Sequence, residues 1–196
     1  MGYMNRLNAM YTLCENHGVL RVVSRFIRHE TGLEEVRFYE QLMEDTQRQD
    51  DWPILHLLCF SLPNHMAPPV SWALAMKELN HYLQTVLEMP DSPALRSVLA
   101  AQLASIPALD RHYPEEVELE CDVSAWFAAI LAEKERGNRR DWFREVPRLE
   151  SFENARLVVG DSYNVTSTVG TGWEANAAGM GWELDSPLHR SRIDMA

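Results

Sequence analysis

The chain has 196 residues, of which 46% are hydrophobic, and its 29 acidic and 18 basic residues give a net charge of −11 at pH 7. Nucleic acids and anionic membrane surfaces are bound by clustered cations, so this charge excludes both as expected partners. The sequence contains no apolar stretch near the ~20 residues of a membrane span and no signal peptide, which predicts a cytoplasmic protein with one hydrophobic core.

The cysteines indicate a reducing compartment. Cys14, Cys59 and Cys121 are odd in number and far apart, and no CxxC pair occurs, so the sequence predicts neither a zinc site nor a disulfide framework. Cys59 lies in a strongly apolar stretch, where a free cysteine usually behaves as a small buried hydrophobe.

Two helices are predicted at the start of the chain. The first covers about residues 5–16 and ends near Gly18, which can adopt the left-handed cap conformation. The second has the most regular helical spacing in the sequence and ends at Gly32; its apolar positions are Val19, Val22, Val23, Phe26 and Ile27.

The polar side of the second helix carries three arginines at helical spacing, Arg21, Arg25 and Arg28. Three guanidinium groups on one side can bind a phosphate or a carboxylate, which makes them candidate binding residues. The alternative is that they pair with acidic neighbours. A third predicted helix, residues 33–47, offers four such neighbours, Glu34, Glu35, Glu40 and Glu44. Its expected apolar face consists of Val36, Tyr39, Leu42 and Met43.

Residues 52–89 hold the densest apolar material and are predicted to form a helical hairpin around which the other helices pack. Prolines interrupt the helix between its two halves. The second half carries a continuous apolar stripe at Trp72, Met76, Leu79, Leu83 and Val86. His65 lies in the proline-rich hinge, where a rigid loop can hold a side chain at a cleft, so it is a candidate binding residue.

Further helices are predicted after residue 89. Ser92 and Pro93 have the character of an N-cap and first helical residue, and the helix they start ends before Pro107. The acidic residues 110–122 are interpreted as a loop in preference to a short edge strand. One more helix starts at Val123, and a short one precedes Pro147.

The C-terminal part differs in character from the rest. Residues 157–159 and 163–169 are rich in β-branched residues and are separated by Gly-Asp-Ser, which predicts a β-hairpin. The stretch from Gly170 onward is predicted to be an irregular tail, with Trp173 and Trp182 as docking residues for the body or for a partner. The sequence therefore predicts a helical domain at residues 1–152, followed by a hairpin and tail at residues 153–196.

A metal site is the main chemical alternative. Glu78 and His81 form an ExxH pair, the half-motif that helix-bundle di-metal sites use twice, and His56, His65 and Glu30 are conceivable further ligands. At ~100° per residue, however, this pair lies away from the apolar stripe of its helix, and a bundle site requires inward ligands. The preferred interpretation is that Glu78 and His81 are surface residues and that no metal or other cofactor is bound.

The predicted fold is all-α, a multi-helix bundle of about seven helices with a small C-terminal β-hairpin and an irregular tail. The preferred functional hypothesis is a non-enzymatic accessory protein that binds another protein or peptide through the hinge cleft or the tail. Two alternatives stay open: a metal-dependent helical-bundle enzyme, and a helical carrier that presents its tail to a modifying enzyme. Neither the partner nor the oligomeric state follows from the sequence.

Overall fold

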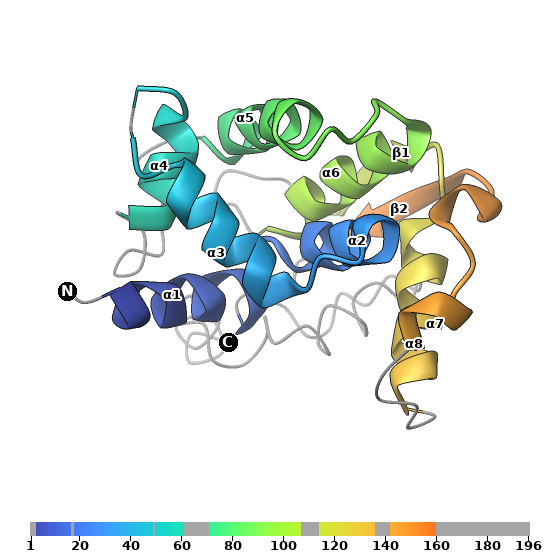
Figure 1. Cartoon of the computed structure of the whole chain (residues 1–196). Helices are drawn as coiled ribbons and strands as arrows, with labels where there is room; N and C mark the ends of the chain where they lie inside the picture. Colours follow the sequence, from blue (N-terminus) through green and yellow to red (C-terminus); the bar gives the residue numbers. More distant parts are fainter. Residues whose placement is uncertain are drawn as a thin grey trace, which may run out of the picture.

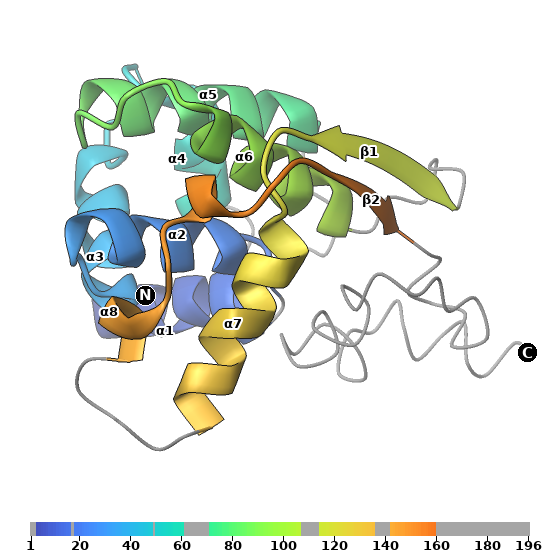
Figure 2. The same ribbon diagram turned by 90° about the vertical axis from the view of Figure 1, so that its right-hand side faces the viewer.

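A computed structural model describes residues 3–16, 18–48, 50–60, 71–106, 114–135 and 142–159. Helices pack against one another, and one pair of strands lies along α6 (Figures 1 and 2). The elements, in chain order, are α1 (Tyr3–Tyr11), the π-helical turn η1 (Thr12–Asn16), α2 (Arg21–Thr31), α3 (Glu35–Asp45), α4 (Pro53–Phe60), α5 (Trp72–Thr85), α6 (Pro93–Ser105), β1 (Glu115–Leu119), α7 (Val123–Glu135), α8 (Trp142–Glu145), the 3₁₀ turn η3 (Leu149–Ser151) and β2 (Ala155–Val159).

The predicted fold class is confirmed: the described residues form a mainly helical bundle with one small antiparallel strand pair. None of the helices in the described ranges has the length and apolar character needed to span a membrane.

The N-terminal helices follow the predicted pattern with two changes. All five apolar positions predicted for the second helix are buried, and Gly32 ends α2 in the left-handed conformation, with its N–H donating to the Arg28 carbonyl. The first change is that α1 stops at Tyr11, and a wider π-helical turn continues to Asn16 before Gly18 reverses the chain. The second is that Val36, predicted to face inward, is 37% exposed, whereas Phe38 is buried together with the predicted Tyr39, Leu42 and Met43.

The element around which the chain packs is α6. It contacts α2, α5, α7, η3 and both strands, whereas the predicted centre, the α4–α5 pair, lies at one end of the molecule (Figure 1). Helix α6 buries three alanines, Ala94, Ala101 and Ala104, and small side chains let several neighbouring elements approach one helix closely. Its predicted start is confirmed, since the Ser92 hydroxyl accepts a hydrogen bond from the Leu95 N–H and Pro93 is the first helical residue.

The apolar stripe of α5 is buried in its middle and exposed at its end. Met76, Leu79 and Leu83 belong to the core, Trp72 is half-buried, and Val86 is exposed. The stripe therefore attaches α5 to the body through Met76, Leu79 and Leu83, and Trp72 in its first turn packs against the same core.

Replacing Leu83 with alanine is expected to lower the free energy of unfolding by about 2–5 kcal/mol, the usual effect of emptying a buried leucine site. Leu74, in the same helix, is 51% exposed and provides the matched control, for which the change should stay within about ±0.5 kcal/mol. Urea unfolding of both variants measures the difference. Equal losses would show that α5 lies outside the cooperative core.

The strand pairing differs from the prediction. Strand β2 contains the predicted strand residues 157–159, but it pairs with β1, in the acidic segment that was interpreted as a loop. The pair is antiparallel, with Glu115 opposite Val159 and Leu119 opposite Ala155. The loop interpretation is therefore wrong, because the alternation of Val117 and Leu119 with glutamates already has the period of a half-exposed strand. The predicted partner, residues 163–169, lies outside the described residues.

Strand β2 packs with the helical body. Leu157 and Val159 are buried together with Leu119 of β1, while Arg156 on the outer side pairs with Glu116 and Glu118. The predicted domain boundary after Phe152 falls immediately before this strand. The division into a helical domain at residues 1–152 and a separate C-terminal part stays a prediction.

Candidate functional site

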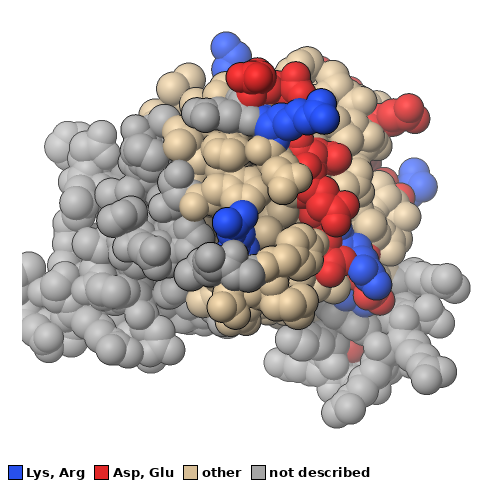
Figure 3. Space-filling view, turned by 60° about the vertical axis from the view of Figure 1, so that its left-hand side comes forward, with Lys and Arg blue, Asp and Glu red and all other residues tan. Residues whose placement is uncertain are grey.

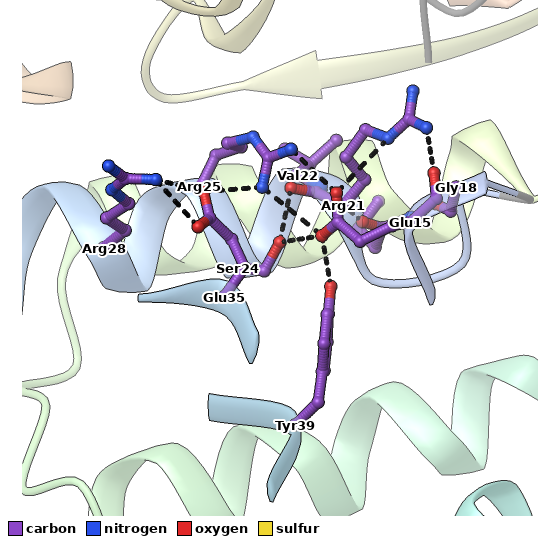
Figure 4. Close-up of polar contacts among 10 residues, drawn as sticks. Glu15, Gly18, Arg21, Val22, Ser24, Arg25, Arg28, Glu35 and Tyr39 are labelled. Atoms are coloured by element: carbon purple, nitrogen blue, oxygen red, sulfur yellow. Dashed lines mark hydrogen bonds and ion pairs between the residues drawn. The ribbon is translucent and has the colours of Figure 1, made fainter. Parts of the chain in front are cut away.

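The turn η1 carries a buried carboxylate, Glu15, whose residue is only 3% exposed. A π-helical turn is wider than an α-helical one, and such turns are common at functional sites. Glu15 lies beside α2, and the hydroxyl of Tyr39 reaches it from α3 (Figure 4). The Oε1 atom accepts hydrogen bonds from the Tyr39 hydroxyl at 2.5 Å and from the Ser24 hydroxyl at 2.9 Å. Two different helices, α3 and α2, therefore supply hydrogen-bond donors to this carboxylate.

The three arginines of α2 surround two carboxylates, Glu15 and Glu35. Arg25 bridges them, with Nη2 2.7 Å from Glu15 Oε2 and Nη1 2.6 Å from Glu35 Oε1. Arg21 donates to the Glu15 backbone carbonyl, and its Nε lies 3.7 Å from the carboxylate. Arg28 binds Glu35 at 2.8 Å and covers the ring of Phe143. We call these five charged residues the Glu15–Glu35 network.

Two side chains at the network, Arg25 and Tyr39, have raised pKa values. Burial opposes the charge of Arg25, but the carboxylates of Glu15 and Glu35 outweigh burial, so the pKa of Arg25 is raised. Burial, reinforced by the Glu15 carboxylate, raises the pKa of Tyr39 well above its usual value. The phenol therefore stays protonated and donates to Glu15. Such a network can hold η1, α2 and α3 in one arrangement.

Of the two interpretations left open for the arginines, the contacts correspond to pairing with the chain's own acidic residues. Glu35 is among the four partners expected from the sequence. Glu15 was missed, because it precedes Arg21 and Arg25 by six and ten residues, across a chain reversal that no helical periodicity indicates. Binding of an external phosphate or carboxylate by these arginines stays a prediction.

The candidate metal ligands have other contacts. The Glu78 Oε2 accepts a hydrogen bond at 2.6 Å from the Leu55 N–H, in the first turn of α4. His56 Nδ1 lies 2.8 Å from the Thr46 carbonyl, and its ring stacks on Phe60. His81 is exposed, with its ring beside Trp52. In the described part of the chain, no group of three or more His, Cys, Asp or Glu residues is placed to hold a metal ion.

Glu78 is thus more than a surface residue, since it caps the N-terminus of α4 from a neighbouring helix. Glu78→Ala is expected to lower the free energy of unfolding by about 0.5–2 kcal/mol, the range for loss of an N-terminal cap. The neighbouring, exposed Lys77 supplies a control that should change by less than about 0.5 kcal/mol. Thermal unfolding measures the effect, and elemental analysis of both variants should give the same metal content as the parent chain.

The remaining predicted binding residues, His65, Trp173 and Trp182, lie outside the described residues. The three cysteines are buried thiols. Burial raises the pKa of Cys59 to about 12, and it also raises the pKa values of Cys14 and Cys121. All three are therefore protonated at neutral pH, which is the inert state of a thiol.

A second feature is an exposed apolar area formed by α1 and α3. The two helices run antiparallel: the Tyr3 hydroxyl is 3.5 Å from Glu44, near the end of α3, and the Tyr11 ring packs edge-on against Tyr39. Val36 lies one turn before Tyr39 on the same helix. We define the α1–α3 surface by its exposed large apolar residues, which are Tyr3, Met4, Tyr11 and Val36.

Acidic side chains accompany this apolar area. Glu34 and Glu44 are exposed at the two ends of α3, and Glu40 between them is half-buried and paired with Arg37. Figure 3 shows a band of Asp and Glu side chains, with Lys and Arg side chains among them, next to uncharged surface. The arrangement combines apolar contact area with negative charge at its border.

Comparison of the chain with models of protein families, with curated proteins and with solved structures gives no match.

Proposed function

We propose that the protein is a non-enzymatic binding protein that engages another protein or peptide through the α1–α3 surface. The observation that carries the proposal is the exposure of four large apolar residues on two adjacent helices. Met4 alone is 70% exposed, and Met4 and Tyr11 are seven residues apart on one side of α1. Methionine and tyrosine are enriched where proteins meet, because they provide adaptable or rigid contact area.

The charge of the surface favours a partner with basic residues beside its apolar anchors. Glu34 and Glu44 provide carboxylates at the border of the apolar area, where charge affects association rate and specificity. A second copy of the chain is a poorer occupant, because each copy carries a net charge of −11. The proposed ligand is therefore a helix or extended segment with apolar and basic residues.

Two further observations support a binding function over catalysis. The arginines that could hold an anionic substrate have carboxylate partners within the chain, and the cysteine thiols are buried and protonated. The second predicted contact, through Trp173 and Trp182 in the tail, is compatible with this proposal and remains part of it.

Site-specific photo-crosslinking tests the proposal. A photoreactive amino acid replaces Met4 in one variant and Leu74, an exposed apolar residue of α5, in the matched control. Helix α5 lies across the molecule from α1 (Figures 1 and 2), so the control samples a separate surface. In the cells that express the protein, the Met4 variant is expected to crosslink to a partner segment containing basic residues, and the Leu74 variant is not.

The same experiment distinguishes the other occupants. Tyr11→Glu in the Met4 crosslinking variant should remove most of the product, because it places a charge within the apolar area. Adducts to residues 160–196 of the same chain, or to a second copy, would contradict the proposal and assign the surface to self-contact. Equal labelling from positions 4 and 74 would show that the surface has no preferred partner.

A further inference from the structure

The side chain of His29, in the last turn of α2, is 6% exposed and lies between two oxygen atoms. Its Nδ1 is 2.8 Å from Glu30 Oε1, and its Nε2 is 3.0 Å from the backbone carbonyl oxygen of Val146. A carboxylate and a carbonyl can only accept hydrogen bonds. A neutral imidazole has one N–H and one lone pair, so it satisfies one of these oxygens and directs its lone pair at the other. Only the doubly protonated imidazolium satisfies both.

This pair of contacts joins α2 to the segment that contains α8. Val146 follows α8 directly and is buried, and the neighbouring Arg28 covers the ring of Phe143 within α8, 4.4 Å from its centroid. The His29 ring also packs in a T-shaped arrangement with the ring of Trp126, from α7, and the two ring centroids are 5.7 Å apart. Two consecutive residues of α2 therefore contact the α8 segment: Arg28 at Phe143 and His29 at Val146. Of these two side chains, His29 is the one that can change its charge near neutral pH.

The surroundings of His29 shift its pKa in opposite directions. The hydrogen bond to Glu30 raises the pKa of His29, burial lowers it, and the Val146 carbonyl and the charge of Glu30 raise it further. Arg148, which follows α8, lowers it. The net direction is upward from 6.5. The same hydrogen bond lowers the pKa of Glu30, whose carboxylate is therefore ionised when the ring is charged.

We propose that His29 is a pH-dependent link that holds α8 and the turn after it against α2 while its imidazole is doubly protonated, and that releases one of its two hydrogen bonds when the ring becomes neutral. The link regulates how firmly one segment of the body is attached, and it is independent of the proposed binding surface on α1 and α3.

The pH range follows from the directions of the two shifts. His29 has a higher pKa in the folded protein than its ordinary value of 6.5, so its protonation stabilises the fold. This stabilisation is complete below pH 6.5 and is lost as the pH rises through the pKa of His29 in the folded protein. Glu30 has a lower pKa in the folded protein than its ordinary value of 4.5, so its ionised form stabilises the fold. This stabilisation is present above pH 4.5 and is lost in stronger acid. The link is therefore at full strength between these two pH values and weakens on the alkaline side.

The first measurement is an NMR titration of the His29 ring in the full chain, with the signal assigned by its absence in His29→Gln. The expected pKa lies above 6.5 and falls in Glu30→Gln, which keeps the side-chain shape and removes the charge. The exposed His81 provides the internal control, and its titration should not change in Glu30→Gln. A His29 pKa at or below 6.5, or one that Glu30→Gln leaves unchanged, would overturn the proposal.

The second measurement tests the attachment itself. Hydrogen exchange of the amides from Phe143 to Val146, corrected for the intrinsic effect of pH, gives the equilibrium constant for opening of this segment. It should increase as the pH rises through the measured pKa of His29, up to ten-fold for each unit by which that pKa is raised. Glu30→Gln should reduce the increase, and His81→Gln should leave it unchanged. An opening constant that does not vary with pH in the parent chain would overturn the link.

Discussion

Glu15→Ala is expected to destabilise the protein by up to about 3–5 kcal/mol, the range for removing one partner of a buried ion pair, with Glu35 remaining as the second carboxylate of Arg25. Arg25 would lose the carboxylate that lies 2.7 Å from its Nη2. The Tyr39 hydroxyl would lose its acceptor in a buried position, whereas the Ser24 hydroxyl keeps the Arg21 carbonyl as an acceptor. Urea unfolding of the variant measures the loss.

Two matched variants separate the charge of Glu15 from its shape. Glu15→Gln keeps an acceptor for the hydroxyls but removes the charge, so its loss should lie between that of the alanine variant and zero. Glu34→Ala removes an exposed carboxylate a few residues before Tyr39 and should stay within about ±0.5 kcal/mol. If Glu15→Ala cost no more than Glu34→Ala, the Glu15–Glu35 network would contribute nothing to stability.

A chain that ends at Phe152 is expected to lose stability, although the sequence alone predicts that it keeps its fold. The truncation removes β2, including the buried Leu157 and Val159, and uncovers Leu119 of β1. Burying an aliphatic side chain contributes about 1.5–3 kcal/mol, so the two lost residues together account for about 3–6 kcal/mol.

The control for this truncation is a chain that ends at Val159, which retains both strands. Thermal unfolding followed by circular dichroism should show a cooperative transition for the longer chain and a lower midpoint for the shorter one. Equal midpoints would mean that β2 contributes little to the core and that the helical body is complete at Phe152.

Local signals in the sequence were sufficient to predict most helices. The apolar spacing of α2, the left-handed Gly32 after it, and the Ser92–Pro93 start of α6 each depend on contacts within a few residues, which a sequence pattern records directly. The centre of the fold was predicted wrongly for the same reason. High apolar density suggested α4 and α5, whereas the central position of α6 depends on its small residues and on its contacts with distant elements.

In the candidate site, too, the sequence indicated the local contacts and missed those between distant residues. The arginines of α2 and their partner Glu35 were identifiable, because helical spacing and nearby acidic residues indicate such pairs. Glu15 was not, since a carboxylate near a helix end looks solvent-exposed until the chain reversal at Gly18 brings α2 beside it. Glu78 was assigned to the surface from its angle on α5, but the N-terminus of α4 lies there and uses the carboxylate as a cap.

The strand pair has a consequence for the order in which the chain folds. Because α7 and α8 lie between β1 and β2 in the sequence, closing this loop costs conformational entropy, and such non-local pairing forms late. Until β2 arrives, β1 presents an unpaired edge, which other copies of the chain can extend into an aggregate. The outward-facing residues of β1 are Glu116 and Glu118, so two copies that meet at this edge repel each other. After folding, the same two carboxylates bind Arg156, so one pair of side chains protects the edge first and then attaches the strand that covers it.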